Sequence, residues 1–436
     1  KLRSFERNNQ DNDNDNGMST TLLLVSLLLF LTTLCSHAFV SPRIVSTAAA
    51  TTTALTAKAP KTRVEQAGCG IALIPSGNNQ LFDPDEEGKI GGTQARVDAS
   101  YHWKGGSSTS SSSSSSLIDN TNTDAQHWLE DIGLPLNFAK PNKPVSAKLL
   151  GRTRIIGDDA PGDIQHVVLK LPDGMHYVEG QSLAVIPPGI NPANGKALYK
   201  PRLYSIASTR YGDLLDGNTV SLCVRQADYY DPITNAIDPA KAGVCSHWLC
   251  HGAKVGEDIT VAGPVGKTML LPTDPTKDII MVATGTGVAP FRSFLHRLFM
   301  EQTVARHLFS ANAWLILGVP VTAGLLYPDE LAAMQENANS SSASSASSLT
   351  IDYAISREMT NTINGGKLYV QHVLAQQADV LLEKLEHGAV IYFCGLKGMM
   401  PGILEALEDV CASRQMDFPV KLKQWKANEQ WHVEVY

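Results

Sequence analysis

Residues 278–302 read DIIMVATGTGVAPFRSFLHRLFMEQ and contain three successive segments that favour different secondary structures. The apolar run at the start is typical of a buried strand, and the run that begins at residue 289 is typical of a helix. The TGTG between them would let the backbone approach a phosphate, and the helix N-terminus would supply free N–H groups. Many tight turns contain such glycines, but this order of strand, turn and helix predicts a βα unit with a phosphate-binding turn.

The same alternation continues towards the C-terminus. The apolar stretch AWLILGVP (313–320) precedes the helix-like PDELAAMQEN (328–337), and AVIYFCGLKG (389–398) precedes ILEALEDVCASR (403–414). Apolar strands that alternate with helices indicate a parallel sheet. We therefore predict an α/β parallel-sheet domain over residues 274–436.

The preceding region, residues 140–273, has a different texture. Short β-rich runs are separated there by Gly, Pro and Asp: SAKLLGRTRII, IQHVVLKL, QSLAVIPPG, RLYSIAST, TVSLCVRQ and DITVAGPVG. Six such runs within about 130 residues predict a small antiparallel β-barrel. The predicted fold class is thus two-domain, with an antiparallel β-barrel followed by an α/β domain.

Composition excludes some functions. The 436-residue chain has a formal net charge of −7, which argues against a nucleic-acid binder that neutralises phosphates. Seven scattered cysteines lack the spacing of a disulfide framework, and they favour a reducing compartment. Cys245 and Cys250, with His247 and His251, lack a second ligand pair at zinc-site spacing, so we predict packing residues and no metal.

Two stretches of the barrel region carry chemistry. RLYSIAS (202–208) would present a cation, a ring and a hydroxyl from one strand. Tyr204 could stack on a flat ring system, Arg202 could hold phosphate oxygens, and Ser205 could reach a ring nitrogen, which are the demands of FAD. GVCSHWLC (243–250) is either a capped surface helix or a helix whose start faces a pyrophosphate.

The N-terminal region indicates targeting. Residues 1–17 are polar, residues 21–35 form an apolar run of signal-peptide type, and residues 40–63 are rich in Ser, Thr and Ala without acidic residues. We predict a bipartite signal and transit region over residues 1–58, with a plain secretory signal as the alternative. Residues 59–139 form a low-complexity extension that includes GGSSTSSSSSSS.

The motifs occur in a specific order: RLYSIAS, GVCSHWLC, GPVGK, GTGVAPFRSF, LGVP, SRE, CGLKGM and the terminal WHVEVY. This order resembles that of plant-type (plastid) ferredoxin–NADP⁺ reductases over residues 140–436, and the targeting region resembles that of algae with a secondary plastid. The resemblance implies an FAD-binding barrel (140–273), an NADP(H)-binding domain (274–436) and location in the plastid stroma or on the stromal face of the thylakoid.

The resemblance also implies cofactor-binding residues. Those for FAD are Arg202, Leu203, Tyr204, Ser205, Cys223, Val224, Arg225, Tyr229, Val244, Cys245, Ser246 and Thr286. Those for NADP(H) are Gly318, Val319, Pro320, Ser356, Arg357, Lys367, Tyr369, Gln371, Gly395 and Leu396. Arg225 replaces the family's usual Lys, and the long segment 231–242 leaves the choice between Tyr229 and Tyr230 open. Arg357 and Lys367 suit the 2′-phosphate of NADP, where an NAD enzyme would have an acidic residue.

Four catalytic residues follow from the same resemblance. Ser205 and Glu434, which is also a cofactor contact, would lie near the reacting flavin nitrogen, and Cys394 would lie near the nicotinamide. Terminal Tyr436 would cover the flavin face that the nicotinamide needs. Alternatively, Tyr436 frays and Cys394 packs in the core.

The implied reaction is electron transfer from reduced ferredoxin to NADP⁺ in photosynthesis. Alternatives are the same enzyme in the reverse direction and a flavoprotein that serves as a docking or tethering subunit. The expected partner is ferredoxin, with flavodoxin and peripheral thylakoid association as further expectations. Because ferredoxins are acidic, a basic docking face is expected. Its candidates are Lys140, Lys143, Lys148, Arg152, Arg154, Lys423 and Lys426.

Overall fold

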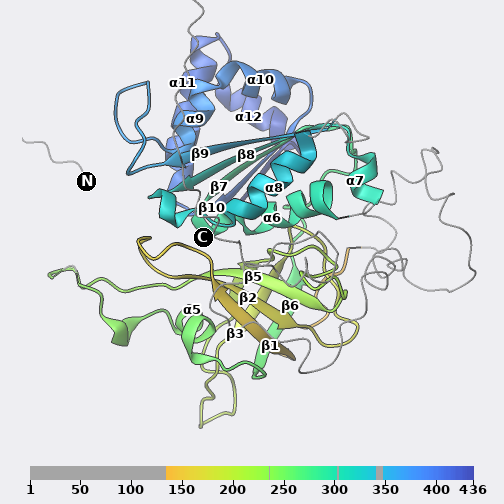
Figure 1. Cartoon of the computed structure of the whole chain (residues 1–436), viewed down its shortest axis with the longest axis vertical. Coiled ribbons are helices and arrows are strands. Elements are labelled where there is room, and N and C mark those ends of the chain that lie inside the picture. The colour runs from red at the N-terminus through yellow and green to blue at the C-terminus, as the bar shows by residue number, and fades with distance from the viewer. Residues whose placement is uncertain (1–133, 235, 302–303, 340–346) are drawn as a thin grey trace, which may run out of the picture. The chain divides into compact units, whose positions relative to one another are not determined.

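The computed structural model describes residues 134–234, 236–301, 304–339 and 347–436. The targeting region (1–58) and nearly all of the 59–139 extension lie outside these residues. The described chain forms two sheets, one antiparallel and one parallel, which follow each other in the sequence (Figure 1). The predicted fold class is confirmed.

The antiparallel sheet contains all six strands predicted from the sequence. They are β1 (Val145–Arg154), β2 (Ile164–Lys170), β3 (Ser182–Ile186), β4 (Arg202–Ser205), β5 (Thr219–Arg225) and β6 (Asp258–Val265), in the order β4-β3-β6-β1-β2-β5. A bridge between Ile206 and Leu222 joins the two outer strands and closes the sheet. Alternate residues such as Val220, Leu222 and Val224 fill the interior, because side chains of a strand point to opposite faces in turn.

The parallel sheet is built from β7 (Ile279–Thr284), β8 (Asn312–Val319), β9 (Ser348–Ile355), β10 (Val390–Gly395) and β11 (Trp431–Val435), in the order β11-β10-β7-β8-β9. Helices cover both faces. One face packs on α6 (Ala289–Leu295), its π-helical continuation η4 (His296–Met300), α7 (Val304–Leu308) and α8 (Pro328–Asn339). The other packs on α9 (Val370–Gln376), α10 (Ala378–Glu386), α11 (Met399–Ser413) and α12 (Phe418–Ala427).

The strand β7 shows why both faces need apolar residues. Ile279 and Met281 belong to the core that contains α6 and α8, whereas Ile280 and Val282 belong to the core that contains α9 to α12. The α6 and α8 face is the one nearer the antiparallel sheet in Figure 1. A strand covered on both faces reads as a continuous apolar run, as the sequence does here.

The turn after β7 has the geometry that its glycines allow. It is a 3₁₀ turn, η3 (Gly285–Val288), and Gly285 has a φ of +54°. A side chain on Gly287 would overlap the backbone carbonyl of Cys394 in β10. Glycine is therefore required at 287 by the close approach of the neighbouring strand. Among the described residues, no helix is both long enough and apolar enough to cross a membrane.

Candidate active site

One cavity of about 670 Å³ collects residues from both domains. Its barrel side comes from β4, β5, the loop after β5 and the short helix α5 (Val244–His247). Its other side comes from the end of β7, η3 and the C-terminal strand β11. The residues that line it are Arg202, Leu203, Tyr204, Ser205, Cys223, Arg225, Gln226, Ala227, Asp228, Tyr230, Gly243, Val244, Cys245, Ser246, Thr284, Gly285, Thr286, Ala289, Leu396, Glu434, Val435 and Tyr436.

Strand β4 supplies a ring and a cation to this wall. Burial raises the pKa of Tyr204, and the neighbouring Cys245 acts in the same direction, so the phenol stays neutral. Exposed Arg202 donates to the carbonyl of Lys200 at 2.9 Å. A guanidinium has five N–H donors, so most of its donors remain for a ligand.

Strand β5 contributes Cys223 and Arg225 to the cavity, but not Val224. The alternation of a strand places Val224, which is fully buried, in the barrel core instead. The Val224 side chain therefore does not line the cavity, and the FAD contact expected of this residue stays a prediction.

The start of α5 also faces the cavity. Ser246 Oγ accepts a hydrogen bond from the Ala227 backbone N–H at 3.0 Å and lies 3.3 Å from the carbonyl of Gly243. These contacts hold the turn before the helix, and the first N–H groups of a helix have no partner within the helix. The start of the helix in GVCSHWLC thus lines a cavity, and the pyrophosphate that one of the two sequence interpretations places there stays a prediction.

A cluster of proton-bearing groups has members from both domains. Ser182 Oγ donates to Glu434 Oε1 at 2.9 Å, and Ser182 pairs in register with Ser205 across β3 and β4. Burial raises the pKa of Glu434, although the Ser182 hydrogen bond partly offsets this. Burial also raises the pKa of Cys394 to about 12, and the neighbouring Ser205 side chain partly offsets this rise. The structure thus brings three of the four expected catalytic residues together and adds Ser182, the first residue of β3, which the sequence analysis missed.

Terminal Tyr436 lines the cavity as well. Its hydroxyl lies 2.5 Å from Thr286 Oγ1, and its backbone N–H donates to the carbonyl of Gly395 at 3.0 Å. The Tyr436 carbonyl also accepts from the Lys397 N–H at 2.9 Å, so three contacts hold this residue, although 58% of its surface is exposed. An aromatic ring held at a cavity rim can be displaced more readily than one packed in a core.

A second group of expected residues lies beyond the carboxyl ends of β8 and β9. The Ser356 N–H donates to the carbonyl of Val319 at 3.0 Å, and the Arg357 N–H donates to that of Pro320 at 2.9 Å. The GVP and SRE turns are therefore adjacent, which follows from the parallel pairing of their strands. In α/β sheets, ligands bind at this edge.

The remaining nucleotide candidates lie close to these turns in the fold. Thr360, which lies just after the SRE turn, forms an antiparallel β-bridge with Lys367. Tyr369 is the N-cap of α9. Arg357, Lys367 and Tyr369 are exposed. Within the described residues no ion pair involves either cation, so their charge is available to an anion. The structure does not bring these residues, or Gly318, Gln371 and Gly395, into the 670 Å³ cavity.

The long 231–242 segment explains one difference from the expectation. Tyr230 lines the cavity, whereas Tyr229 lies outside it with the Lys241 ammonium 4.7 Å from its ring centroid. The sequence did not decide which of the two tyrosines contacts FAD, because the insertion at 231–242 makes the alignment with the family's motif ambiguous there. The cavity residues that the sequence analysis missed are Gln226, Ala227, Asp228, Gly243, Thr284, Gly285, Ala289 and Val435. Most of them adjoin predicted residues in the chain, which is the signal that could have found them.

One docking candidate is corrected by the structure. Arg152 is only 8% exposed, and its guanidinium donates to the carbonyls of Ala253 at 2.6 Å and Leu249 at 3.3 Å. It closes the end of the helical segment after α5 and cannot meet a partner protein. Arg154 is partly buried and contacts Asp158 and Asp163. The exposed candidates are Lys140, Lys143, Lys148, Lys423 and Lys426.

Comparisons with known proteins agree with this geometry. Residues 281–405 match the family described as "Oxidoreductase NAD-binding domain". The chain is 49% identical over 303 residues to a chloroplastic root isozyme 2 of ferredoxin–NADP reductase from Arabidopsis thaliana, which covers 69% of this chain and 77% of that protein. It is 44% identical over 310 residues to the chloroplastic ferredoxin–NADP reductase of Chlamydomonas reinhardtii, with 71% and 84% covered.

A solved structure shows the same fold. It is the ferredoxin–NADP⁺ reductase of Plasmodium falciparum with 2′P-AMP, with a TM-score of 0.54 and 22% sequence identity. The similarity covers 70% of this chain and 100% of that one.

Proposed function

The chain belongs to the ferredoxin–NADP⁺ reductase family, and from this premise we propose how its residues perform the family's reaction. Two reduced ferredoxins, one NADP⁺ and one proton give two oxidised ferredoxins and one NADPH. The observation that carries the assignment is a cavity with walls from both domains. Such a cavity allows one bound cofactor to face both an electron donor and a nucleotide.

The cavity fits FAD by its chemistry. Its wall combines the Tyr204 ring, the Arg202 and Arg225 cations and the start of α5, which suit a ring system joined to a diphosphate. When bound, FAD supplies the redox chemistry that links a one-electron donor to a two-electron acceptor. The protein's own contribution is then to bind, orient and exclude water.

Ser205 and Glu434 would hold and transfer the proton that the reaction consumes. The Glu434 carboxyl has a raised pKa and uses Oε1 for the Ser182 hydroxyl, so Oε2 can hold a proton at the cavity wall. We expect Ser205 to present its hydroxyl to the reacting ring nitrogen. Cys394, whose thiol stays protonated, would pack near the nicotinamide.

The nucleotide would bind along the edge defined by the GVP and SRE turns. Arg357 and Lys367 are free of ion pairs within the described chain and would read the 2′-phosphate, while Tyr369 would stack on the adenine. A planar guanidinium binds phosphate oxygens through two parallel hydrogen bonds. The chain would therefore prefer NADPH to NADH.

The setting of the reaction is a further part of the proposal. Plastid location is supported by the chloroplastic names of the relatives. The composition of residues 1–58 supports a bipartite presequence, and with it an alga with a secondary plastid and a stromal destination. We extend the partners to flavodoxin and to peripheral thylakoid association. The FAD-binding domain would span residues 140–273 and the NADP(H)-binding domain residues 274–436.

The direct test is to purify the protein with its flavin and compare nucleotides and partners. We expect a yellow protein that reduces ferricyanide with NADPH at least 10-fold more efficiently than with NADH, and that makes NADPH from reduced ferredoxin. A yellow protein without NADPH oxidation would contradict the proposal and support the docking-subunit alternative.

A further inference from the structure

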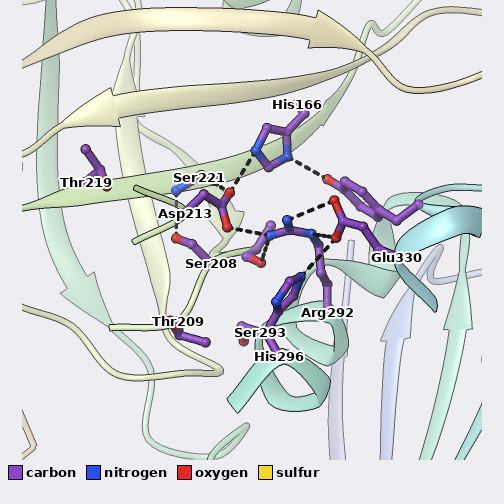
Figure 2. A network of polar contacts seen from close by, with 12 residues as sticks. His166, Ser208, Thr209, Asp213, Thr219, Ser221, Arg292, Ser293, His296 and Glu330 are labelled. Carbon is purple, nitrogen blue, oxygen red and sulfur yellow. Dashed lines mark hydrogen bonds and ion pairs between the residues drawn. The ribbon is translucent and has the colours of Figure 1, made fainter. Parts of the chain in front are cut away.

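A network of buried polar side chains joins the two domains (Figure 2). We call it the interdomain network, and its members are His166, Asp213, Arg292, His296 and Glu330. His166 lies on β2 and Asp213 on the loop 206–218 that joins β4 to β5. Arg292, His296 and Glu330 lie on α6, η4 and α8. All five are less than 5% exposed.

Arg292 lies at the centre of this network. Its Nη1 donates to Asp213 Oδ1 at 2.9 Å and to the backbone carbonyl of Ala207 at 2.8 Å. Its Nε and Nη2 donate to the two carboxylate oxygens of Glu330 at 2.7 and 3.1 Å. One side of the guanidinium therefore binds the barrel domain, and the other side binds its own domain.

The remaining members support the two carboxylates. His166 Nε2 lies 2.9 Å from Asp213 Oδ2, which also accepts from Ser221 Oγ at 2.6 Å. His296 Nε2 lies 3.0 Å from Glu330 Oε2. The Arg292 guanidinium holds the pKa of both the Asp213 and the Glu330 carboxyls below their usual range despite burial. Both acids are therefore ionised, and the contacts across the domains are charge-assisted.

The position of Arg292 in the chain connects it to the reaction. On its own domain, α6 begins directly after η3, the turn that carries Thr286 of the cavity wall. On the barrel domain, Ala207 lies in the loop 206–218, two residues after Ser205, the last residue of the cavity-lining strand β4. The Arg292 side chain thus links the loop between β4 and β5 to α6, the helix that follows the η3 turn.

An apolar contact would hold two domains together without specifying one arrangement. Buried ion pairs cost desolvation, and replacement by apolar residues is often neutral or stabilising. A fork of four hydrogen bonds, in contrast, is satisfied at only one relative position of its partners, because each bond depends on distance and angle. Reaction rates are sensitive to such placement, since a misplacement of about 1 Å can cost about 100-fold.

We propose that Arg292 is a positioning residue for the reaction between the bound nucleotide and the flavin. It holds the nucleotide domain at one orientation relative to the cavity-lining strands β4 and β5, so that the nicotinamide reaches the flavin in a reactive geometry. It touches neither the cavity nor the exposed 2′-phosphate candidates. This inference rests on the proposed function.

The test is Arg292→Met in the full flavin-loaded protein, with Arg414→Met as the matched control. Arg414 forms an ion pair with Asp379 within the nucleotide domain and away from the interface. We expect Arg292→Met to keep its flavin content, its affinity for 2′-phospho-AMP and its rate of flavin reduction by ferredoxin. Flavin reduction by NADPH in a single turnover should fall at least 10-fold, and amide hydrogen exchange should rise in residues 206–218. The control should match the parent in every assay.

A second variant covers the case in which Arg292→Met does not fold. Arg292→Lys keeps the charge but cannot reach both carboxylates and the Ala207 carbonyl, so it should show the same selective loss at smaller size. NADPH-driven rates within 2-fold of the parent in a folded variant would overturn the proposal. So would equal losses with ferredoxin and NADPH, since these would indicate a general structural role. A parent protein that NADPH does not reduce would instead contradict the proposed function and not the role of Arg292.

Discussion

The cavity and the interdomain network both lie where the two domains meet, yet their polar groups differ in how many hydrogen-bond partners the protein supplies. In the network, Arg292 is fully buried and bonds to three acceptor residues. In the cavity, Arg202 is exposed, and among the described residues it bonds only to carbonyls of its own segment, while no side chain caps the start of α5. Donors that are satisfied by the protein hold its parts together, and donors left over are available to a ligand.

The same contrast applies to the carboxylates. Asp213 and Glu330 of the network have lowered pKa values because a guanidinium is in contact with both. Glu434 of the cavity has no cation partner within the described residues, and burial raises its pKa. Paired acids remain charged and structural, whereas an acid without a cation partner at a cavity wall holds its proton more readily and can pass it to a ligand.

Removing one network carboxylate should have the largest effect on stability. Asp213→Ala leaves the Arg292 cation without its partner across the domains, and breaking a buried pair in this way costs about 3–5 kcal/mol. The measurement is the free energy of unfolding in urea. Asp379→Ala, which breaks the exposed pair with Arg414, should cost less than about 1 kcal/mol. Similar losses in both variants would remove the contrast between buried and exposed pairs.

Glu301 should make stability depend on pH. It follows η4 and accepts a hydrogen bond from Thr209 of the barrel loop. Burial raises the pKa of Glu301 from 4.5 to about 8. The Thr209 hydrogen bond partly offsets this rise, and the nearby Glu179 carboxylate adds to it. Because the folded state keeps this proton and the unfolded state loses it above pH 4.5, stability is lost as pH rises from 4.5 to about 8. The free energy of unfolding should fall relative to Glu301→Gln by about 1.4 kcal/mol per pH unit between about pH 5.5 and 7.5. A constant difference between the two proteins would show that Glu301 is already ionised.

Arg357 should affect recognition without affecting stability, because it has no ion pair to lose among the described residues. Arg357→Ala should raise the KM for NADPH by about 10-fold, the scale of one charge-assisted contact. The KM for NADH should barely change, and the unfolding midpoint should stay within about 1 °C by the same reasoning. Equal increases for both nucleotides would mean that Arg357 does not read the 2′-phosphate.

Tyr436 should show the smallest effect. If its ring occupies the surface that the nicotinamide needs, Tyr436→Ser should tighten NADP⁺ binding by about 1 kcal/mol, the value of one stacked aromatic contact. Turnover should nevertheless fall, because a product that stacks well leaves slowly. Tyr436→Phe should resemble the parent apart from the lost contact with Thr286. Flavin difference spectra measure this affinity, and an unchanged value in the Ser variant would exclude the cap.

Local patterns were sufficient to predict much of the molecule. All six barrel strands and the strand-turn-helix order at residues 279–295 follow from period-two alternation, apolar runs and glycines, which are properties of neighbouring residues. Most residues expected at the cavity line it for the same reason, since β4 and the start of α5 carry them as continuous segments. Where an insertion shifts the register, as at Tyr229 and Tyr230, the pattern left two alternatives.

Contacts between distant segments required the tertiary structure. Arg152 has the composition of a surface cation, and only its partners about 100 residues away show that it is buried. Ser182 and Glu434 are 252 residues apart, and Arg292 lies 79 residues from Asp213. A hydrogen bond depends on the distance and angle between two groups, and these depend on how sheets and helices pack. The residue types therefore indicated which chemistry was present, and the packing of the two domains decided which charges are buried and paired and which remain free to bind.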